Sequence, residues 1–436
     1  LFKILIFVTA ASTILGKIGI TSNALKYANP HCFLEIFMKN KGPLKGIKVI
    51  DLTAMVSGPT ATMMLGDQGA DVIKVEPLDG ELMRKVGNSI NGMTDSFLCC
   101  NRSKRSITLD LKKSKALNIL KKLIASADIF IQNFRPGTID RMGLGYEKIK
   151  KINKNIIYVS ISGFGEKGPY IKQRVYDPVI QALSGLADIQ RDQVTGVPKQ
   201  VRTIIPDKTT GMATAQAISS ALFYRERYKK GQHIKIAMLD VMIAYLWPEG
   251  SSTLSFVGKE KNPSDGQLGL DLVFITKDKK YITAGAVTDK EWTGLCKAIK
   301  REDLIDNIKF NTPNARVKNK VERRKIIAEE IAKQSCEDLL SSLQDQEVPS
   351  APILSREEVI ENEQVLENNM IQYFDSKAFG KIRSPRPAPI YTETKVTGEQ
   401  LAPLLGENSE EILKELDYSE KEINSFIKEK IISKYK

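Results

Sequence analysis

The segment GIKVIDLTAMVSGPTATMMLGDQGADVIKVEP, residues 46–77, contains the pattern that decides the fold. Two apolar runs in it, IKVIDLT (47–53) and DVIKVE (71–76), have the length and β-branched composition of buried strands. Between them, Pro59 suits the first turn of a helix that continues through Leu65. A strand, a helix and a second strand in this order predict a short βαβ unit.

The residues that follow repeat this alternation. The helical pattern 114–127 precedes the strand DIFIQNF (128–134), and the helical pattern 146–153 precedes the strand NIIYVSISGF (155–164). A long helix from about Thr210 to Tyr228 then leads into the strand QHIKIAML (232–239), which ends a first large domain near residue 240. This order of elements predicts an α/β fold with a doubly wound, Rossmann-like parallel sheet.

After residue 240 the composition changes. Residues 241–265 are rich in Gly, Ser, Lys and Pro and are predicted to be a linker, followed by a smaller α+β domain over 266–345. Residues 346–368 include VPSAPILSREEV (348–359) and are predicted to be a return linker. In the remaining segment, 369–436, KIRSPRPAPIYTETK (381–395) is predicted to be irregular, and a charged helical tail is predicted from Ser409 onward.

The charge balance restricts the classes of partner. The chain has 65 Lys and Arg against 52 Asp and Glu, a formal net charge of +13. The lysines are scattered, and the compact basic stripe interleaved with aromatic residues that nucleic-acid binding needs does not occur. We therefore expect solvated helix faces and no nucleic-acid partner, although the same charge is compatible with a polyanionic small ligand.

Cysteine and histidine usage limits the chemistry. The five cysteines include no CxxC pair, so neither a disulfide framework nor a metal site is indicated, and we expect a reduced, cytoplasmic protein. The only histidines are His31 and His233, and His233 lies in an alternating pattern typical of an ordinary strand position. A mechanism that needs a histidine base therefore has few positions available.

The first 37 residues differ from the rest of the chain. Their apolar run is short and interrupted by Thr and Ser, so we expect no membrane span. Met38 opens MKNKGPLKGIKVIDLT (38–53), which resembles a natural domain start, and residues 1–37 are therefore interpreted as an N-terminal extension. If they are a genuine transit segment, the mitochondrial matrix is the expected location instead.

Motif absences remove several enzyme classes as leading interpretations. The sequence has no GxxxxGK[ST] loop, no GxGxxG after the first strand, no HExxH and no GxSxG, which argues against kinases, Rossmann dehydrogenases, zincins and α/β hydrolases. The remaining candidates are loops at the carboxyl ends of predicted strands, where open α/β sheets place their sites. These loops are TAMVSGPT (53–60), EPLDGE (76–81), NFRPG (133–137), SGFGEKG (162–168) and PDKTTGM (206–212).

Asp207, in the last of these loops, has two readings. It directly precedes a predicted helix whose first turn contains Thr209 and Thr210, so it suits an N-cap that accepts a backbone N–H. The same position suits a nucleophile, because a helix N-terminus favours an ionised carboxylate. An ionised carboxylate needs no general base to attack a thioester, which agrees with the scarcity of histidine.

Several motifs occur in an order that resembles the class III CoA transferases, a family that includes formyl-CoA and carnitine CoA transferases. The resemblance is strong over residues 43–240 and continues more weakly to the C-terminal tail. The blocks are residues 46–77, CNRSKRSITLDLK (100–112), NFRPGTIDRMGLGYE (133–147), SGFGEKGPY (162–170), YDPVIQALSGL (176–186), PDKTTGM (206–212), APILSREEV (351–359) and PLLGENSEEILKELDYS (403–419).

The resemblance implies that Asp207 is the catalytic nucleophile and that CoA and acyl-CoA are substrates rather than tightly bound cofactors. It also implies a set of CoA contacts, in which cationic side chains suit phosphates and main-chain groups suit adenine and pantetheine. For the apolar members core packing stays an alternative, and for Lys112 and Arg174 a solvated charge. The residues carried over are Val56, Ser57, Leu109, Asp110, Leu111, Lys112, Asn133, Phe134, Arg135, Arg141, Met142 and Arg174.

Two positions depart from the formyl-CoA transferase pattern. Val56 stands where that pattern has a glutamine supporting the reacting carbonyl, so the oxyanion contact must come from elsewhere. The glycine-run loop is also missing, NPSDGQLG (262–269) being the nearest equivalent, which argues against formate or oxalate. Succinyl-CoA or another dicarboxyl-CoA is the preferred donor, from the family's range, and the acceptor acid stays open.

A racemase and a non-catalytic CoA-binding protein are the alternative functions, and a homodimer is the expected assembly. The related α-methylacyl-CoA racemases use a histidine next to an aspartate, but the corresponding pair here is Tyr176 and Asp177, and tyrosine is a poor base at neutral pH. A non-catalytic CoA-binding protein would keep the phosphate contacts without using Asp207. The resemblance further implies an interlocked homodimer of two-domain subunits, in which residues 369–436 complete the large domain.

Overall fold

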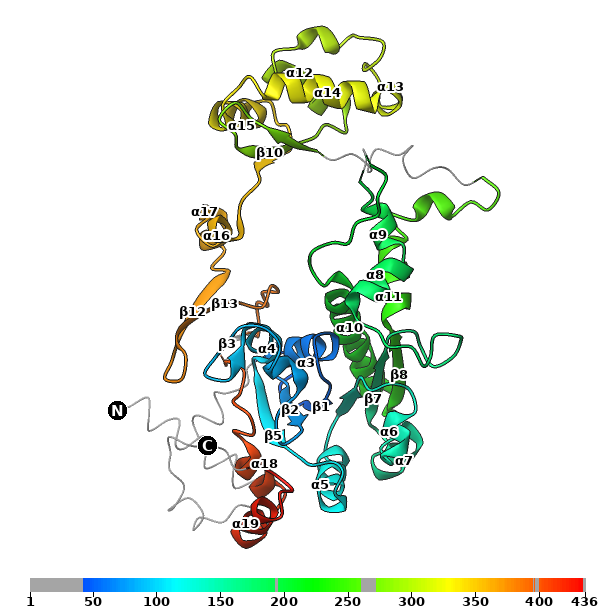
Figure 1. Ribbon diagram of the computed structural model, residues 1–436, viewed down its shortest axis with the longest axis vertical. Helices are drawn as coiled ribbons and strands as arrows, with labels where there is room; N and C mark the ends of the chain where they lie inside the picture. The colour runs from blue at the N-terminus through cyan, green and yellow to red at the C-terminus, as the bar shows by residue number, and fades with distance from the viewer. Residues whose placement is uncertain (1–41, 193–194, 260–271, 395, 397–399, 434–436) are drawn as a thin grey trace.

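The structure is a computed structural model that describes residues 42–192, 195–259, 272–394, 396 and 400–433 (Figure 1). The predictions for residues 1–37 and for the loop 262–269 lie outside these ranges. Among the described residues no helix combines the length and apolar character needed to cross a membrane.

The centre of the fold is a six-stranded sheet in which every neighbouring pair is parallel. The strand order is β5-β2-β1-β6-β7-β8, so the sheet grows outward from β1 in one direction and then from β6 in the other. The doubly wound parallel sheet predicted from the sequence is confirmed. The strands are β1 Lys48–Leu52, β2 Asp71–Glu76, β5 Lys104–Thr108, β6 Ile129–Gln132, β7 Ile157–Ser162 and β8 Gln232–Ala237.

Helices cover both faces of this sheet because successive strand residues point to opposite sides. Val49 belongs to the core beneath helices α3 (Ser57–Asp67) and α10 (Ile205–Tyr228), while Ile50 belongs to the core beneath α5 (Ser114–Ala125) and α7 (Tyr146–Ile152). The first face therefore brings α3 and α10 together.

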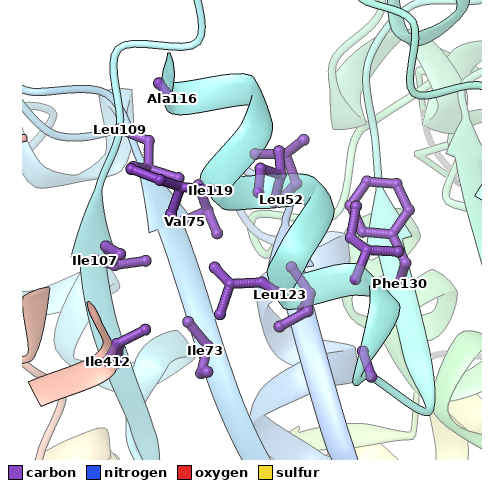
Figure 2. Close-up of a cluster of buried hydrophobic side chains, with 14 of the residues drawn as sticks. Leu52, Ile73, Val75, Ile107, Leu109, Ala116, Ile119, Leu123, Phe130 and Ile412 are labelled. Carbon is purple, nitrogen blue, oxygen red and sulfur yellow. The ribbon is translucent and has the colours of Figure 1, made fainter. Parts of the chain in front are cut away.

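The C-terminal segment returns to the second face. Figure 2 shows Ile412, from α18 (Ser409–Glu415), beside Ile107 and Ile73 in the cluster that α5 covers. Beyond α19 (Glu420–Lys428), the carbonyl of Ile431 accepts a hydrogen bond from the Asp110 N–H at 2.9 Å. Residues from the segments 50–158 and 412–432 thus share one hydrophobic core.

A smaller α+β unit stands apart from the sheet, at the other end of the molecule's longest axis (Figure 1). Its antiparallel strands have the order β11-β10-β9 and pack with four helices around a core that contains Trp292 and Phe310. The elements are β9 Val273–Ile275, β10 Tyr281–Ala284, β11 Ser350–Pro352, α12 Asp289–Ala298, α13 Pro313–Lys318, α14 Lys320–Ile331 and α15 Cys336–Asp345.

Three local predictions are corrected. Helix α10 begins at Ile205 rather than near Thr210, because Pro206 fits the first turn of a helix. The predicted strand end and linker contain α11 (Met238–Leu246), whose sequence MLDVMIAYL is a run of good helix formers. Pairing with β10 also places β11 of the small sheet inside the predicted return linker.

The fourth correction concerns the segment predicted to be irregular. Residues Gly380–Pro385 form β13, which pairs with β12 (Ile371–Ser376) in an antiparallel hairpin. Pro385 is the last residue of an isolated two-stranded sheet, where a missing N–H is tolerated. The remaining short elements are β3 Ser89–Ile90, β4 Met93–Thr94, α4 Asp95–Asn101, α6 Thr138–Arg141, α8 Asp177–Leu183, α9 Leu186–Ile189, α16 Arg356–Val359 and α17 Glu363–Glu367, with 3₁₀ turns at Leu82–Arg84, Ser252–Leu254 and Glu302–Leu304.

Candidate active site

The candidate site lies between β1 and β6, where the order in which strands are added to the sheet reverses. The loops after these two strands are joined by Asn133, whose side-chain oxygen accepts from the Ala54 N–H at 3.0 Å and whose amide donates to the Ala54 carbonyl at 2.8 Å. Ligands of open α/β sheets bind at such a switch point. Asn133 therefore acts as a clamp on the loop that leads into α3.

The buried ion pair between Lys74 and Glu81 fixes the same loop, residues 53–56. Met55 has a left-handed backbone with φ of 68°, and its N–H donates to a Glu81 carboxylate oxygen at 2.8 Å. Glu81 forms an ion pair of 2.9 Å with Lys74, and the Lys74 ammonium also donates to the Thr53 carbonyl at 3.0 Å. Both side chains are nearly inaccessible to solvent, so the loop geometry depends on them.

A second buried pair lies next to the first. Asp51 accepts hydrogen bonds from Lys104 at 3.0 Å and from Thr62 at 2.7 Å. Burial alone would raise the pKa of Asp51, but the charges of Lys104 and Lys74 hold it well below its usual range. Burial lowers the pKa of Lys104 to about 8 despite the opposing effect of Asp51. Asp51 and Lys104 thereby fix the start of α3, since Asp51 accepts from Thr62 and Lys104 donates to the Pro59 carbonyl.

Asp207 lies in the first turn of α10, close to the start of α3. The two helices approach closely at Gly211, where an added Cβ would lie 2.9 Å from the Thr60 Cβ and 3.0 Å from the Ser57 carbonyl oxygen. Only a residue without a side chain permits this approach. The close packing brings Asp207 within hydrogen-bonding range of Ser57, the first residue of α3.

The environment of Asp207 makes its carboxylate unusually basic. Burial and the nearby charge of Asp177 raise the pKa of Asp207 to about 6, while hydrogen bonds from the Ser57 side chain and backbone act in the opposite direction. The Asp207 N–H donates to Asp177 at 3.2 Å, and Gln181 donates to the other Asp177 oxygen at 2.7 Å. At neutral pH the Asp207 carboxylate is ionised in its larger fraction, although it is only partly hydrated.

The N-cap reading of Asp207 is wrong. The N-cap of α10 is Ile204, whose side chain makes no capping hydrogen bond, and Asp207 is the third helical residue. A carboxylate in the first turn still benefits from the positive end of the helix. Asp207 is therefore available for chemistry instead of being engaged as a cap.

The other residues carried over from the resemblance fall into separate groups. Ser57 lies beside Asp207, whereas the Val56 side chain is buried in an apolar cluster with Met83 and Phe97. Leu109 is buried in the core, whereas Leu111 and Met142 are partly buried and pack against it. Lys112 and Arg174 are exposed, and Asp110 is partly buried.

The strand order separates residues 109–112 from residues 133–142. The first group follows β5 and the second follows β6, and β2 and β1 lie between them. Three strand spacings of about 4.8 Å give a separation of roughly 14 Å. A ligand that contacted both groups would have to be long and extended.

A cavity of about 1290 Å³ lies at the β6–β8 side of the switch point. It exceeds the roughly 300–1,000 Å³ typical of small-molecule pockets. Three residues that the resemblance carried over as CoA contacts line it, namely Phe134, Arg135 and Arg141. Four lysines that were interpreted as scattered, solvated charge also lie in its wall. These lysines are Lys148, Lys167, Lys172 and Lys235. They are spread along the sequence and come together only in the folded chain.

The inner wall of this cavity is aromatic. Tyr146 stacks on His233 with ring centroids 4.8 Å apart, and His233 Nε2 hydrogen-bonds the Ser160 hydroxyl at 2.9 Å. Burial, together with the charge of Lys235, lowers the pKa of His233 below its ordinary value. His233 lies on β8 as predicted, and it is the only histidine among the described residues.

The two residues that correspond to the racemase pair, Tyr176 and Asp177, differ in their exposure to solvent. Tyr176 precedes α8 with 60% of its surface exposed, while Asp177 is buried against Asp207. Within the described ranges there is also no group of three or more His, Cys, Asp or Glu side chains placed to hold a metal ion.

Comparisons with known proteins agree on one family. Residues 44–409 match the model of CoA-transferase family III. The chain is similar to human succinyl-CoA:glutarate CoA-transferase, with 35% identity over 405 residues that cover 91% of this chain and 92% of that protein. It is 34% identical to the succinate–glutarate CoA-transferase of Agrobacterium fabrum, over 87% of this chain and 97% of that protein.

A solved structure shows the same arrangement. The crystal structure of a CaiB/BaiF family protein from Brucella suis superposes with a TM-score of 0.74 at 31% sequence identity. The match covers 86% of this chain and all of that chain. The fold, the family model and the two relatives thus lead to the same assignment.

Proposed function

The chain belongs to CoA-transferase family III, and we propose that it moves CoA from a dicarboxyl-CoA to a carboxylic acid through covalent intermediates on Asp207. The observation that carries the proposal is a carboxylate of raised pKa held where the N-termini of α3 and α10 converge. Two helix N-termini favour its ionised form, and partial burial keeps it reactive by limiting its hydration.

The exchange is divided into steps that conserve every atom. The Asp207 carboxylate attacks the acyl-CoA carbonyl, which forms a mixed anhydride and releases the CoA thiolate. The thiolate then attacks the aspartyl carbonyl, which gives an aspartyl-CoA thioester and frees the donor acid. The acceptor carboxylate reverses both steps, so acceptor-CoA leaves and Asp207 is regenerated. No step in this scheme needs a histidine.

The negative charge that develops on the attacked carbonyl oxygen needs a donor other than Val56, whose side chain is buried in an apolar cluster. We assign this role to backbone N–H groups at the start of α3, in particular that of Gly58. Helices leave the N–H groups of their first turn without an intrahelical partner. These groups are preorganised because Asn133 and Glu81 hold the preceding loop.

The cavity beside the switch point suits the CoA part of the substrate. Arg135 and Arg141 line it and are the groups proposed to bind phosphates. The lysines of the wall add positive charge, in agreement with a ligand that carries several negative charges. CoA and its thioesters act here as substrates that enter and leave, which an open cavity permits.

Succinyl-CoA is the first donor to test because the names of two relatives give succinate or succinyl-CoA together with glutarate. We expect loading by succinyl-CoA and glutaryl-CoA and weak loading by acetyl-CoA. Good turnover of a monocarboxylic donor, with none from any dicarboxyl-CoA, would contradict the donor class while leaving Asp207 as the nucleophile.

The decisive experiment is peptide mass spectrometry after incubation with each acyl-CoA and a hydroxylamine quench. Wild type is expected to carry a hydroxamate on Asp207, and Asp207→Ala to carry none. Asp188→Ala is the control, since Asp188 also lies in the first turn of a helix, the short α9, but is exposed and paired with Arg191.

The same samples distinguish the alternatives. Absence of any adduct together with exchange of the α-proton in deuterated water would indicate a racemase-like enzyme. Absence of both signals, with CoA still bound, would indicate a non-catalytic CoA-binding protein. Neither result is expected, because Tyr176 is exposed, His233 is hydrogen-bonded to Ser160, and Asp207 lies beside Ser57 and Asp177.

We further propose that the subunits, each with a large domain (43–240 and 369–436) and a small domain (266–345), form an interlocked homodimer. Large apolar side chains are exposed on α10, on α11 and directly after α11, including Phe223, Tyr245 and Trp247. These helices lie on the path between the sheet and the small unit (Figure 1). A second subunit is the proposed cover for this surface.

Light scattering after size-exclusion chromatography is expected to give the mass of two chains. Interlocked subunits should also exchange with isotope-labelled subunits no faster than they unfold, because separation requires opening of the chain. A monomer would contradict the homodimer, and rapid exchange would contradict the interlocking alone. The expected cytoplasmic location is a separate proposal, which cell fractionation tests.

A further inference from the structure

Gln181 is a buried polar side chain that the proposed reaction scheme does not use. It lies in the second turn of α8 with 2% of its surface exposed. Its side-chain oxygen accepts from the Val201 N–H at 2.9 Å, and its nitrogen donates to Asp177 Oδ1 at 2.7 Å and to the Val201 carbonyl at 3.2 Å. With its oxygen and its nitrogen both bonded, the amide is fixed in one orientation. It joins the start of α8 to the segment that leads into α10.

The first turn of α10 obtains its hydrogen-bond acceptors from outside the helix. The Ile205 N–H donates to the Thr203 carbonyl at 2.9 Å, and the Asp207 N–H donates to Asp177 Oδ2 at 3.2 Å. Helices leave the N–H groups of their first turn without an intrahelical partner, so these outside acceptors hold the helix start. Gln181 contacts both acceptors, since its nitrogen also lies 3.4 Å from the Thr203 carbonyl oxygen. The backbone of Asp207 is therefore held by groups that Gln181 fixes.

The orientation of Gln181 also decides which groups face Asp177. Because the Val201 N–H occupies the Gln181 oxygen, the nitrogen is the atom that faces Asp177. Both Asp177 oxygens then accept a hydrogen bond, one from Gln181 and the other from the Asp207 N–H. Two donors match a carboxylate that accepts at both oxygens and carries no proton to donate. Gln181 thereby fixes the direction in which the Asp177 carboxylate points.

We propose that Gln181 is a positioning residue for the Asp207 nucleophile, acting through Asp177 and the segment 201–203. The inference rests on the covalent function proposed for Asp207 and adds a residue that supports it. A small displacement of an attacking atom lowers the rate of reaction strongly, so the groups that hold its backbone contribute to that rate. Loss of the Gln181 contacts should therefore reduce covalent loading more than CoA affinity.

An exchange of polar groups between positions 181 and 177 tests this role. Gln181→Glu replaces the donor to Asp177 with a second carboxylate, and two ionised carboxylates at hydrogen-bonding distance repel each other. Asp177→Asn turns one of two acceptors into a donor, which then faces another donor. In the double variant the introduced amide donates to the introduced carboxylate and still accepts from the Asp207 N–H. The introduced carboxylate can still accept from the Val201 N–H, so the hydrogen bonds are restored with one direction reversed.

The measured quantities are the rate of hydroxamate formation on Asp207 with succinyl-CoA and the affinity for CoA, both in the full chain. Each single variant should lower the loading rate by about tenfold or more. The double variant should load at least about fivefold faster than the product of the two single losses predicts, because the two side chains act as a pair. The affinity for CoA should change less than the loading rate in every variant.

Two further variants separate the specific contact from a general disturbance of α8. Gln200→Glu is the matched control, because Gln200 also donates to α8, at the Pro178 carbonyl, but is exposed. This variant makes the same chemical change and should load at the wild-type rate. Gln181→Met removes the hydrogen bonds without adding a charge, so it keeps the test valid if Gln181→Glu does not fold. It should also load more slowly than wild type.

Three results would overturn the role of Gln181 while leaving the proposed function intact. These are wild-type loading in Gln181→Met, single losses that multiply without coupling in the double variant, and equal losses in loading and in CoA affinity. The last would mean that Gln181 only maintains the packing of the domain. A wild-type protein that carries no hydroxamate would instead overturn the function proposed for Asp207, and this inference with it.

Discussion

The backbone N–H of Asp207 donates to the carboxylate of Asp177 at 3.2 Å, so two acidic residues from the starts of α10 and α8 lie side by side. Gln181 holds the other Asp177 oxygen at 2.7 Å. The arrangement leaves the Asp207 side chain free to face Ser57 while a like charge stands behind it. This relationship has consequences for the pH dependence of the enzyme.

Covalent loading of Asp207 should fall as the pH is lowered through 6. The nucleophile must be ionised, and with a pKa of about 6 the ionised fraction drops about tenfold between pH 7 and pH 5. Hydroxamate yield in a rapid-quench series measures this. Asp177→Asn removes the neighbouring charge and should move the midpoint to lower pH, whereas an unchanged midpoint would show that Asp177 does not set it.

Gly211→Ala should separate α3 from α10. The new methyl group would meet Thr60 and the Ser57 carbonyl at contact distances that real Cβ atoms rarely show. We expect a loss of about 1–3 kcal/mol in the free energy of unfolding and a larger relative loss in loading rate than in CoA affinity. Gln216→Ala, on an exposed position of the same helix, should change neither quantity, and equal behaviour of the two variants would count against the close contact.

Asn133→Ala removes both hydrogen bonds to Ala54 and should loosen the loop before α3. Two backbone groups would lose their partners, at about 1–3 kcal/mol. Asn133→Asp keeps the acceptor for the Ala54 N–H but loses the donor to its carbonyl, so it should be intermediate. Denaturant unfolding orders the three proteins, and an unaltered stability in Asn133→Ala would contradict the clamp.

Glu81→Ala should be among the most destabilising single changes in the large domain. It leaves Lys74 charged and buried and frees the Met55 N–H, and breaking a buried pair in this way costs about 3–5 kcal/mol. Asp79→Ala breaks the exposed ion pair with Lys85 and should cost no more than about 1 kcal/mol. Similar losses in the two variants would mean that burial of the pair contributes little.

Much of the fold followed from local patterns. The strands 71–76 and 232–237 and the helix that starts at Ser114 were predicted at or near their observed bounds, because apolar periodicity and turn residues act over a few positions. The errors came where local signals conflict. Prolines suggested irregular structure at Gly380–Pro385, which forms a strand. The predicted strand (232–239) and linker (241–265) divided MLDVMIAYL, which forms one helix.

The sequence by itself determined the order of strands and helices, the family resemblance and the choice of Asp207 as the candidate nucleophile. Only the tertiary structure decided that Asp207 meets Ser57 and Asp177 and that Asn133 clamps Ala54. The physical reason is that burial, pKa and hydrogen-bond partners depend on residues far apart in the chain. Periodicity and spacing carry information about near neighbours alone.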